Sequence, residues 1–146
     1  MIEVSNLVPF LLFGFIISVC GLFDMPYDKS SMVVCEGDMC LRDNFNSCTP
    51  AYGNMANENY NVYFEIRGLK DNGKCEIFVK LEDINMEVVP EEFQSVANLA
   101  IGRSMICEAE EYQKEEVLKG NFDKTMLSNC NGVLANALET VAPYLE

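Results

Sequence analysis

The sequence contains no histidine and no tryptophan, and only 10 of its 146 residues are lysine or arginine. Without histidine the chain cannot assemble Ser-His-Asp or Cys-His nucleophilic machinery, or a zinc hydrolase site of the usual kind. Haem held through an axial histidine is excluded for the same reason. Neither a Gly-x-Gly-x-x-Gly nor a Walker-type loop is present, so nothing cradles a nucleotide. We therefore expect no cofactor, and we assign no catalytic, cofactor-binding or metal-binding residue.

Basic residues are few, and they are also scattered. After residue 23 the side chains carry a charge of −12, from 22 acids and 10 bases. A surface that binds phosphates needs clustered lysine and arginine, so nucleic acid is not an expected partner. The main effect of this charge is on solubility.

An uncharged stretch of 17 residues, 7–23, precedes every lysine and arginine in the chain. Its length is at the lower limit for a transmembrane helix, and it also fits the apolar region of a secretory signal. The residues before it include Glu3 and no base, so flanking charge does not define an orientation. We predict that residues 1–23 are a signal peptide or a membrane anchor, which makes the membrane the first expected partner.

Four fates of this segment stay open. It is retained as an anchor, or it is cleaved after Cys20 or Gly21, where small residues precede the cut. A lipobox-like sequence ends at Cys20, although Val19 stands where a smaller residue is usual. The fourth fate is a core helix of an intracellular protein, which Pro9, Gly14 and the lack of a polar face disfavour.

Six cysteines follow the apolar segment. In an oxidising compartment such an even set becomes a disulfide framework, and this is the favoured interpretation. Six cysteines allow fifteen pairings, among which the sequence does not choose, although the first two are close enough to staple one local loop. An irregular four-thiolate zinc site and reduced core cysteines are the alternatives. The disulfide candidates are Cys35, Cys40, Cys48, Cys75, Cys107 and Cys130.

Residues beyond the apolar segment number about 123, which is one ordinary domain able to bury a real core. Residues 24–59 are rich in Asp, Asn, Ser, Gly and Pro, so we predict an irregular cysteine-containing tether with a short edge strand at 32–34. Residues 60–146 form the predicted small α+β domain. The predicted fold is thus an N-terminal signal or anchor helix followed by a disulfide-stapled α+β domain, with a three-stranded antiparallel sheet and C-terminal helices.

The clearest local signal is Asn72-Gly73 between two alternating apolar segments, which predicts a β-hairpin with a type I′ turn. The pairs that follow from this turn are Lys70–Cys75, Gly68–Ile77, Ile66–Val79 and Phe64–Leu81. Alternation then places Phe64 and Ile66 on an apolar face and Arg67 on the opposite, polar face. Gly68 is a candidate bulge.

Further elements follow the hairpin. The residue pattern at 90–100 predicts a short helix, which we expect to stop at Gly102. The short apolar pattern at 104–109 predicts a third strand. The charged run 108–119 predicts a solvated helix or loop. The residues that share one side of the helix at 90–100 are Phe93, Val96, Ala97 and Ala100.

Two predicted helices close the chain. Asp123 can cap the first, which we expect to end near Asn131-Gly132, a pair suited to a left-handed cap. The second carries apolar residues at helical spacing, and we expect them to face the core. These residues are Leu134, Leu138, Val141 and Leu145.

Cysteine order and a few turn residues give the chain a resemblance to uncharacterised small exported cysteine-containing proteins of archaeal genomes. It covers roughly residues 48–140. It implies an extracytoplasmic disulfide-bonded domain and carries over no catalytic or binding residue. The segments that carry it are Cys48-Thr49-Pro50-Ala51, Tyr63 to Gly68, Asp71 to Cys75, Met105-Ile106-Cys107 and Cys130-Asn131-Gly132.

These features lead us to predict a non-enzymatic binding or surface-structural module, membrane-anchored or secreted, with a protein as its partner. An accessory subunit of a membrane complex is the alternative, and an enzyme that uses thiols or carboxylates is the third hypothesis. A carboxylate pair is the arrangement that acid–base chemistry on a glycoside requires. The acids available for such a pair are Glu65, Glu76, Glu82, Asp83, Glu108, Glu110, Glu111, Glu115 and Glu116.

Overall fold

The structure is a computed structural model that describes residues 27–119, 121 and 123–141. The predicted signal or anchor segment, with Cys20, lies outside the described residues, as does Leu145. Within the described ranges, no helix has both the length and the apolar character needed to cross a membrane.

The described residues from Ser31 onward belong to one compact unit. All helices and strands of the described residues belong to this unit.

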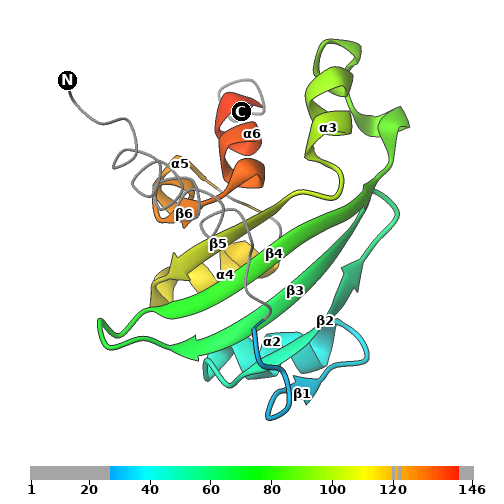
Figure 1. Ribbon diagram of the computed structural model, residues 1–146. Coiled ribbons are helices and arrows are strands. Elements are labelled where there is room, and N and C mark those ends of the chain that lie inside the picture. Colours follow the sequence, from blue (N-terminus) through cyan, green and yellow to red (C-terminus); the bar gives the residue numbers. More distant parts are fainter. Residues whose placement is uncertain (1–26, 120, 122, 142–146) are drawn as a thin grey trace, which may run out of the picture. The chain divides into compact units, whose positions relative to one another are not determined.

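Six strands form one sheet in sequential order (Figure 1). β1 runs parallel to β2, and the other neighbouring strands are antiparallel. The α+β class is confirmed, but the sheet is larger than the three strands predicted, which correspond to β3, β4 and β5. The strands are β1 (Val33–Val34), β2 (Ala51–Ala56), β3 (Tyr60–Leu69), β4 (Cys75–Ile84), β5 (Ser104–Ala109) and β6 (Cys130–Asn131).

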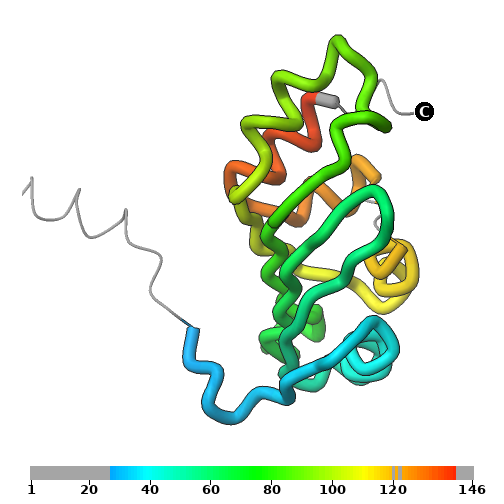
Figure 2. Tube along the Cα trace, turned by 90° about the vertical axis from the view of Figure 1, so that its right-hand side faces the viewer, coloured from blue at the N-terminus to red at the C-terminus, as the bar shows by residue number. Residues whose placement is uncertain are grey.

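Short helices pack on one face and at one end of this sheet. In Figure 1 α2 and α4 lie behind the strands, and in Figure 2 both lie on the same side of them. In both views α3 and α6 lie side by side at one end of the sheet, and they are in contact. The α-helices are α2 (Asp38–Asn46), α3 (Gln94–Ala100), α4 (Lys114–Leu118), α5 (Lys124–Leu127) and α6 (Val133–Val141). The 3-10 helices are η2 (Met86–Val88), η3 (Glu91–Phe93) and η4 (Glu111–Gln113).

The prediction of an irregular tether at 24–59 is wrong for the part that is described, which contains β1, α2 and β2. Leu41 and Phe45 are four residues apart and therefore share one face of α2, where both are fully buried. The turn-forming residues of this segment are distributed between the turn before β1, the ends of α2 and the strand β2 rather than forming a continuous loop. The edge strand predicted at 32–34 is confirmed as β1.

The β3–β4 hairpin is confirmed, but its predicted turn type is wrong. Cys48 is the only described non-glycine residue with a positive φ, which excludes the type I′ conformation at Asn72. Instead the Gly73 amide donates to the Lys70 carbonyl (2.9 Å), and the Lys70 amide donates to the Lys74 carbonyl (2.9 Å). Gly73, at φ +79°, thus takes the left-handed position of a three-residue loop.

The predicted register is wrong as well. Phe64 pairs with Val79 and Ile66 with Ile77, each two residues from the predicted partner. A register shift beside Gly68 confirms the bulge predicted there. Because a shift of two residues preserves the alternation, the apolar face of the hairpin is nevertheless the predicted one.

The elements after the hairpin agree in part with the predictions. η3 and α3 cover the helix predicted at 90–100, and β5 coincides with the strand predicted at 104–109. The charged run 108–119 is not simply solvated, because α4 buries Lys114, Val117 and Leu118. The Lys114 ammonium donates to the carbonyl of Asn46 (2.9 Å), the last residue of α2, where a helix leaves carbonyl groups without partners.

Asp123 caps α5 as predicted, because its carboxylate accepts from the Met126 amide (2.7 Å). The helix ends at Leu127 rather than near residues 131–132, since Cys130–Asn131 pair with β5 as β6. In α6 Leu134 is buried and Leu138 packs against the core at its edge.

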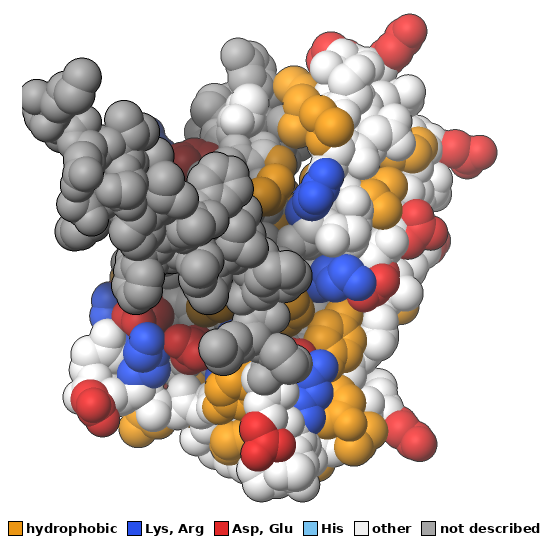
Figure 3. Space-filling model, viewed as in Figure 1, with side chains coloured by type: hydrophobic (Ala, Val, Ile, Leu, Met, Phe, Trp, Pro, Cys, Tyr) orange, Lys and Arg blue, Asp and Glu red, His pale blue; other side chains and the backbone are white. Residues whose placement is uncertain are grey.

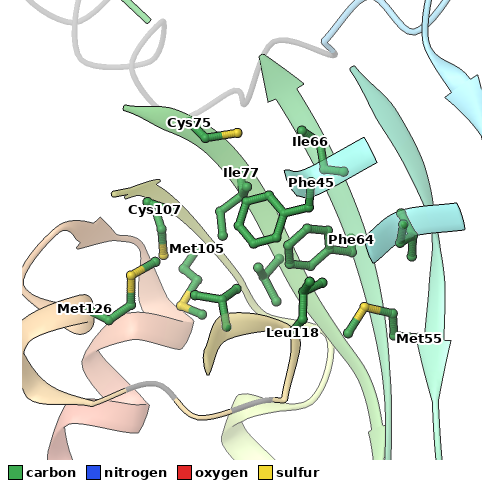
Figure 4. Packing of buried hydrophobic residues seen from close by; sticks show 14 of the residues in the cluster. Phe45, Met55, Phe64, Ile66, Cys75, Ile77, Met105, Cys107, Leu118 and Met126 are labelled. Atoms are coloured by element: carbon green, nitrogen blue, oxygen red, sulfur yellow. The ribbon is translucent and has the colours of Figure 1, made fainter. Parts of the chain in front are cut away.

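The hydrophobic core lies between the sheet and the helices on its covered face (Figure 4). Phe45 of α2 and Phe64 of β3 point toward one another, and their rings meet edge to face with centroids 5.5 Å apart. Met105 of β5 and Met126 of α5 continue the core toward α6.

Three disulfides join the six candidate cysteines. Cys35–Cys40 links β1 to the first turn of α2, and Cys48–Cys75 links the segment after α2 to β4. Cys107–Cys130 joins directly paired residues of β5 and β6. The disulfide interpretation is confirmed, including the local staple between the first two cysteines, and it leaves none of the six for a zinc site.

Candidate binding site

The described part of the molecule has an apolar pocket of about 350 Å³ at one end of the sheet, where α3 and α6 meet the ends of β3 and β4. Its walls come from three separate stretches of the chain, residues 59–60, 81–100 and 137–138. Only two polar residues line it. The lining residues are Asn59, Tyr60, Leu81, Ile84, Val88, Val89, Pro90, Phe93, Val96, Ala97, Ala100, Ala137 and Leu138.

Small side chains explain why this space stays open. Ala97 and Ala100 of α3 and Ala137 of α6 all contribute to the lining. Helices α3 and α6 are in contact, and a methyl group at each of these positions leaves room that a larger side chain would fill.

A set of polar contacts holds the wall between β4 and α3. The side chain of Gln94 donates to the carbonyls of Met86 (3.3 Å) and Val89 (3.2 Å). The Asn85 side chain accepts from the Glu87 amide (3.1 Å) at the start of η2. These contacts fix the loop that carries Val88, Val89 and Pro90, so this wall of the pocket is preformed.

The chemistry of the pocket is therefore that of apolar burial. Ligand sites are usually lined by apolar side chains with a small number of polar groups that orient the ligand. Asn59 and Tyr60 are the polar residues here. Such a site binds by removing apolar surface from water.

Several residues of this site belong to elements that the sequence predicts, but the sequence does not predict a pocket. Phe93, Val96, Ala97 and Ala100 do share one side of a helix as predicted, but in the structure they line the pocket. Leu138 packs against the core as predicted and also lines the pocket. The signal that could have found the site is the pair of alanines in α3, which are too small to fill the face they share.

Each of the nine acids considered for catalysis has a partner, and two of them, Glu76 and Glu108, are neighbours across β4 and β5 that share Lys70. Asp83 accepts from the Ile84 amide (2.9 Å). The other eight form ion pairs with a lysine or arginine. These pairs are Glu65–Arg67, Glu76–Lys70, Glu108–Lys70, Glu110–Lys74, Glu82–Lys80, Glu111–Lys114, Glu115–Lys119 and Glu116–Lys119.

Three of the groups in these ion pairs have pKa values shifted in the direction expected for surface pairs. Hydrogen bonds that the Lys70 ammonium donates to Glu108 and Glu76 raise the pKa of Lys70, and the hydrogen bond from Lys70 lowers the pKa of Glu108. At the end of α4, the hydrogen bonds that Lys119 donates to Glu116 and Glu115 raise the pKa of Lys119. All three shifts favour the charged forms, which suits ion pairing and not proton transfer near neutral pH.

Glu65 differs from the other acids because it is only 2% exposed. Its carboxylate accepts from the Tyr63 hydroxyl (3.0 Å) and from Nε of Arg67 (3.1 Å). The Arg67 guanidinium lies over the Phe78 ring, 4.8 Å from its centroid. The face of the molecule seen in Figure 3 carries charged groups of both signs. The arrangement is that of a hydrogen-bonded structural ion pair.

Among the residues that the structure describes, no three His, Cys, Asp or Glu side chains are grouped to hold a metal ion. The sequence matches no family model, and no curated protein and no solved structure is significantly similar to it.

Proposed function

We propose that this protein is a non-enzymatic, extracytoplasmic binding module, secreted or membrane-anchored, that binds an apolar ligand in the pocket between α3 and α6. The observation that carries this proposal is the preformed apolar pocket itself. Its volume of about 350 Å³ falls within the range of about 300–1,000 Å³ that is usual for small-molecule sites.

The pocket contrasts with the rest of the molecule. Protein interiors are close-packed, and unfilled space costs stability because the lining atoms lose contacts. Here the core beside the pocket is filled by large side chains such as Phe64 and Met105, which are about 1% exposed. An open apolar pocket beside a filled core favours a role in binding.

The three disulfides support the extracytoplasmic part of the proposal. Disulfides persist in oxidising compartments and are rare in reducing ones. Cys75 and Cys107 are almost fully buried within the fold, so these bonds are part of its architecture. The uncharged segment 7–23 supplies a means of export or anchoring.

Filling the pocket should abolish binding of an apolar probe. We expect N-phenyl-1-naphthylamine, a neutral fluorophore, to bind saturably with a dissociation constant of about 10 μM. Ala97→Phe should weaken binding at least tenfold, because the new ring occupies the space between α3 and α6. The measurement is a fluorescence titration, which the absence of tryptophan makes simple.

Leu99→Phe is the matched control, since Leu99 is on the same helix but is 69% exposed and does not line the pocket. It should leave probe binding unchanged. The proposal fails when the unmodified protein shows no saturable signal, or when Ala97→Phe binds the probe as well as Leu99→Phe does.

The extracytoplasmic location has its own test, the intact mass of the protein isolated from its native host. We expect the six paired cysteines to be alkylated only after reduction. A mass that lacks the first 20 or 21 residues would show a secreted form, and a full-length mass with the same protection would show an anchored one. Alkylation of these cysteines before reduction would contradict the proposed location.

A further inference from the structure

The pocket is apolar inside, and the charged residues next to its lining in the sequence are mostly acids. Seven acidic residues are direct sequence neighbours of lining residues, against a single base, Lys80. Six of the seven are exposed, and the seventh, Glu82, is half-buried. In Figure 3 acidic side chains project at the upper right, beside α3 and the segment that precedes it. The seven acids are Glu58, Glu82, Asp83, Glu87, Glu91, Glu92 and Glu139.

Two bases lie near the lining among the described residues, and they offset only part of this charge for an incoming anion. Lys80 is engaged by Glu82, with 3.0 Å between Nζ and the carboxylate oxygen. Arg103 is exposed, and its backbone forms hydrogen bonds with Leu81 and Ala100 of the lining. The amide end of η3 would attract an anion, but Glu91 and Glu92 stand in its first turn. The rim, defined as these seven acids and two bases, therefore has a net charge of −5 beside an apolar cavity.

The lining of the pocket also limits the chemical class of ligand that it can bind. A peptide inserted into the pocket would bring backbone N–H and C=O groups, each of which needs a hydrogen-bond partner once it is buried. The lining offers the side chains of Asn59 and Tyr60, and its other members are apolar. A hydrocarbon chain has no such requirement.

We propose that the ligand is an amphiphile with one hydrocarbon chain and an uncharged or cationic head group, whose chain fills the pocket and whose head lies among the rim acids. This inference rests on the proposed function and adds the ligand class. The acids attract a cationic head and tolerate a neutral one, whereas a carboxylate or phosphate head meets like charge on several sides.

Three ten-carbon probes that differ only in the head group test this inference. Decylamine, decanol and decanoate are used to displace N-phenyl-1-naphthylamine at low ionic strength and neutral pH, below their micellar concentrations. We expect decylammonium and decanol to displace the fluorophore, and decanoate to be about tenfold weaker than either or worse. The gap should narrow in about 0.5 M salt, because exposed charges are then screened.

A charge reversal at the rim separates the local effect from net charge. The double variant Glu91→Lys, Glu92→Lys should strengthen decanoate binding and weaken decylammonium binding, each about tenfold. The control double variant Glu115→Lys, Glu116→Lys changes the net charge by the same amount, but it does so on α4, whose residues do not line the pocket. It should change the binding of decanoate and of decylammonium much less.

The outcomes distinguish the two proposals. One outcome is that the fluorophore binds, that Ala97→Phe abolishes its binding, and that decanoate displaces it as well as decylamine does. This outcome would overturn the head-group inference and leave the proposed function in place. Equal effects of the two double variants would also overturn the inference. If the fluorophore shows no saturable binding to the unmodified protein, the proposed function itself is contradicted.

Discussion

Removing the Cys48–Cys75 disulfide, by the double change Cys48→Ala, Cys75→Ala, is expected to lower the unfolding free energy by about 3–4 kcal/mol. The two cysteines are 27 residues apart in the sequence, so the bond restricts a long loop of the unfolded chain. Cys75 is 1% exposed and lies in the core, where loss of the sulfur atoms also leaves a small space. The measurement is urea denaturation followed by circular dichroism.

The change Cys35→Ala, Cys40→Ala is the matched control, because this disulfide spans only five residues of sequence separation. It should cost about 2 kcal/mol, since closing a short loop removes less entropy from the unfolded chain. Equal losses for the two variants would contradict the expectation that the stabilisation depends on the length of the closed loop.

Gly132→Ala is expected to lower the unfolding free energy by about 3 kcal/mol. A Cβ atom at Gly132 would lie 2.6 Å from the Ser104 carbonyl oxygen and 3.0 Å from Cα of Met105. Both atoms belong to the backbone of β5 and cannot move without disturbing the sheet. The φ of +129° at Gly132 adds backbone strain for any other residue.

Gly102→Ala separates the backbone strain from the close contact. Gly102 also has a positive φ (+76°), but a Cβ atom there would meet nothing within 4 Å. Its expected cost is about 1 kcal/mol, measured in the same denaturation experiment. Similar losses at Gly132 and Gly102 would show that the approach of residue 132 to β5 is not tight.

The Gly132 variant also bears on the pocket. Residue 132 immediately precedes α6, whose Ala137 and Leu138 line the pocket. A displaced α6 should therefore weaken binding of the fluorescent probe in whatever fraction of the protein stays folded.

The hairpin shows what local pattern can and cannot determine. Alternation of apolar and polar residues was sufficient to assign the faces of β3 and β4. The register depended on the loop conformation, and Asn72-Gly73 is compatible with more than one loop. The bulge at Gly68 shifts the register further, and its effect depends on how both strands pack.

Segment 24–59 shows a different limit. Its turn-forming composition suggested a tether, yet Leu41 and Phe45 anchor a helix in the core. Only these two of the nine residues of α2 are buried, which is a weak periodic signal, and the helix is stabilised by tertiary packing against β2 and α4. Composition therefore identified the polar surface of this segment and missed the small apolar face that decides its structure.

The linear order of residues was enough to establish the α+β class, the strand at 104–109, the helix at 90–100, the acidic charge and a cysteine set suited to disulfides. These depend on periodicity, capping residues and composition, all of which act between near neighbours in the chain. Only the tertiary structure decided how Cys48, Cys75, Cys107 and Cys130 pair, which register the hairpin adopts and that α3, α6 and the end of β4 enclose a pocket. Each of these depends on contacts between residues far apart in sequence, and the pocket joins residues 59 and 138.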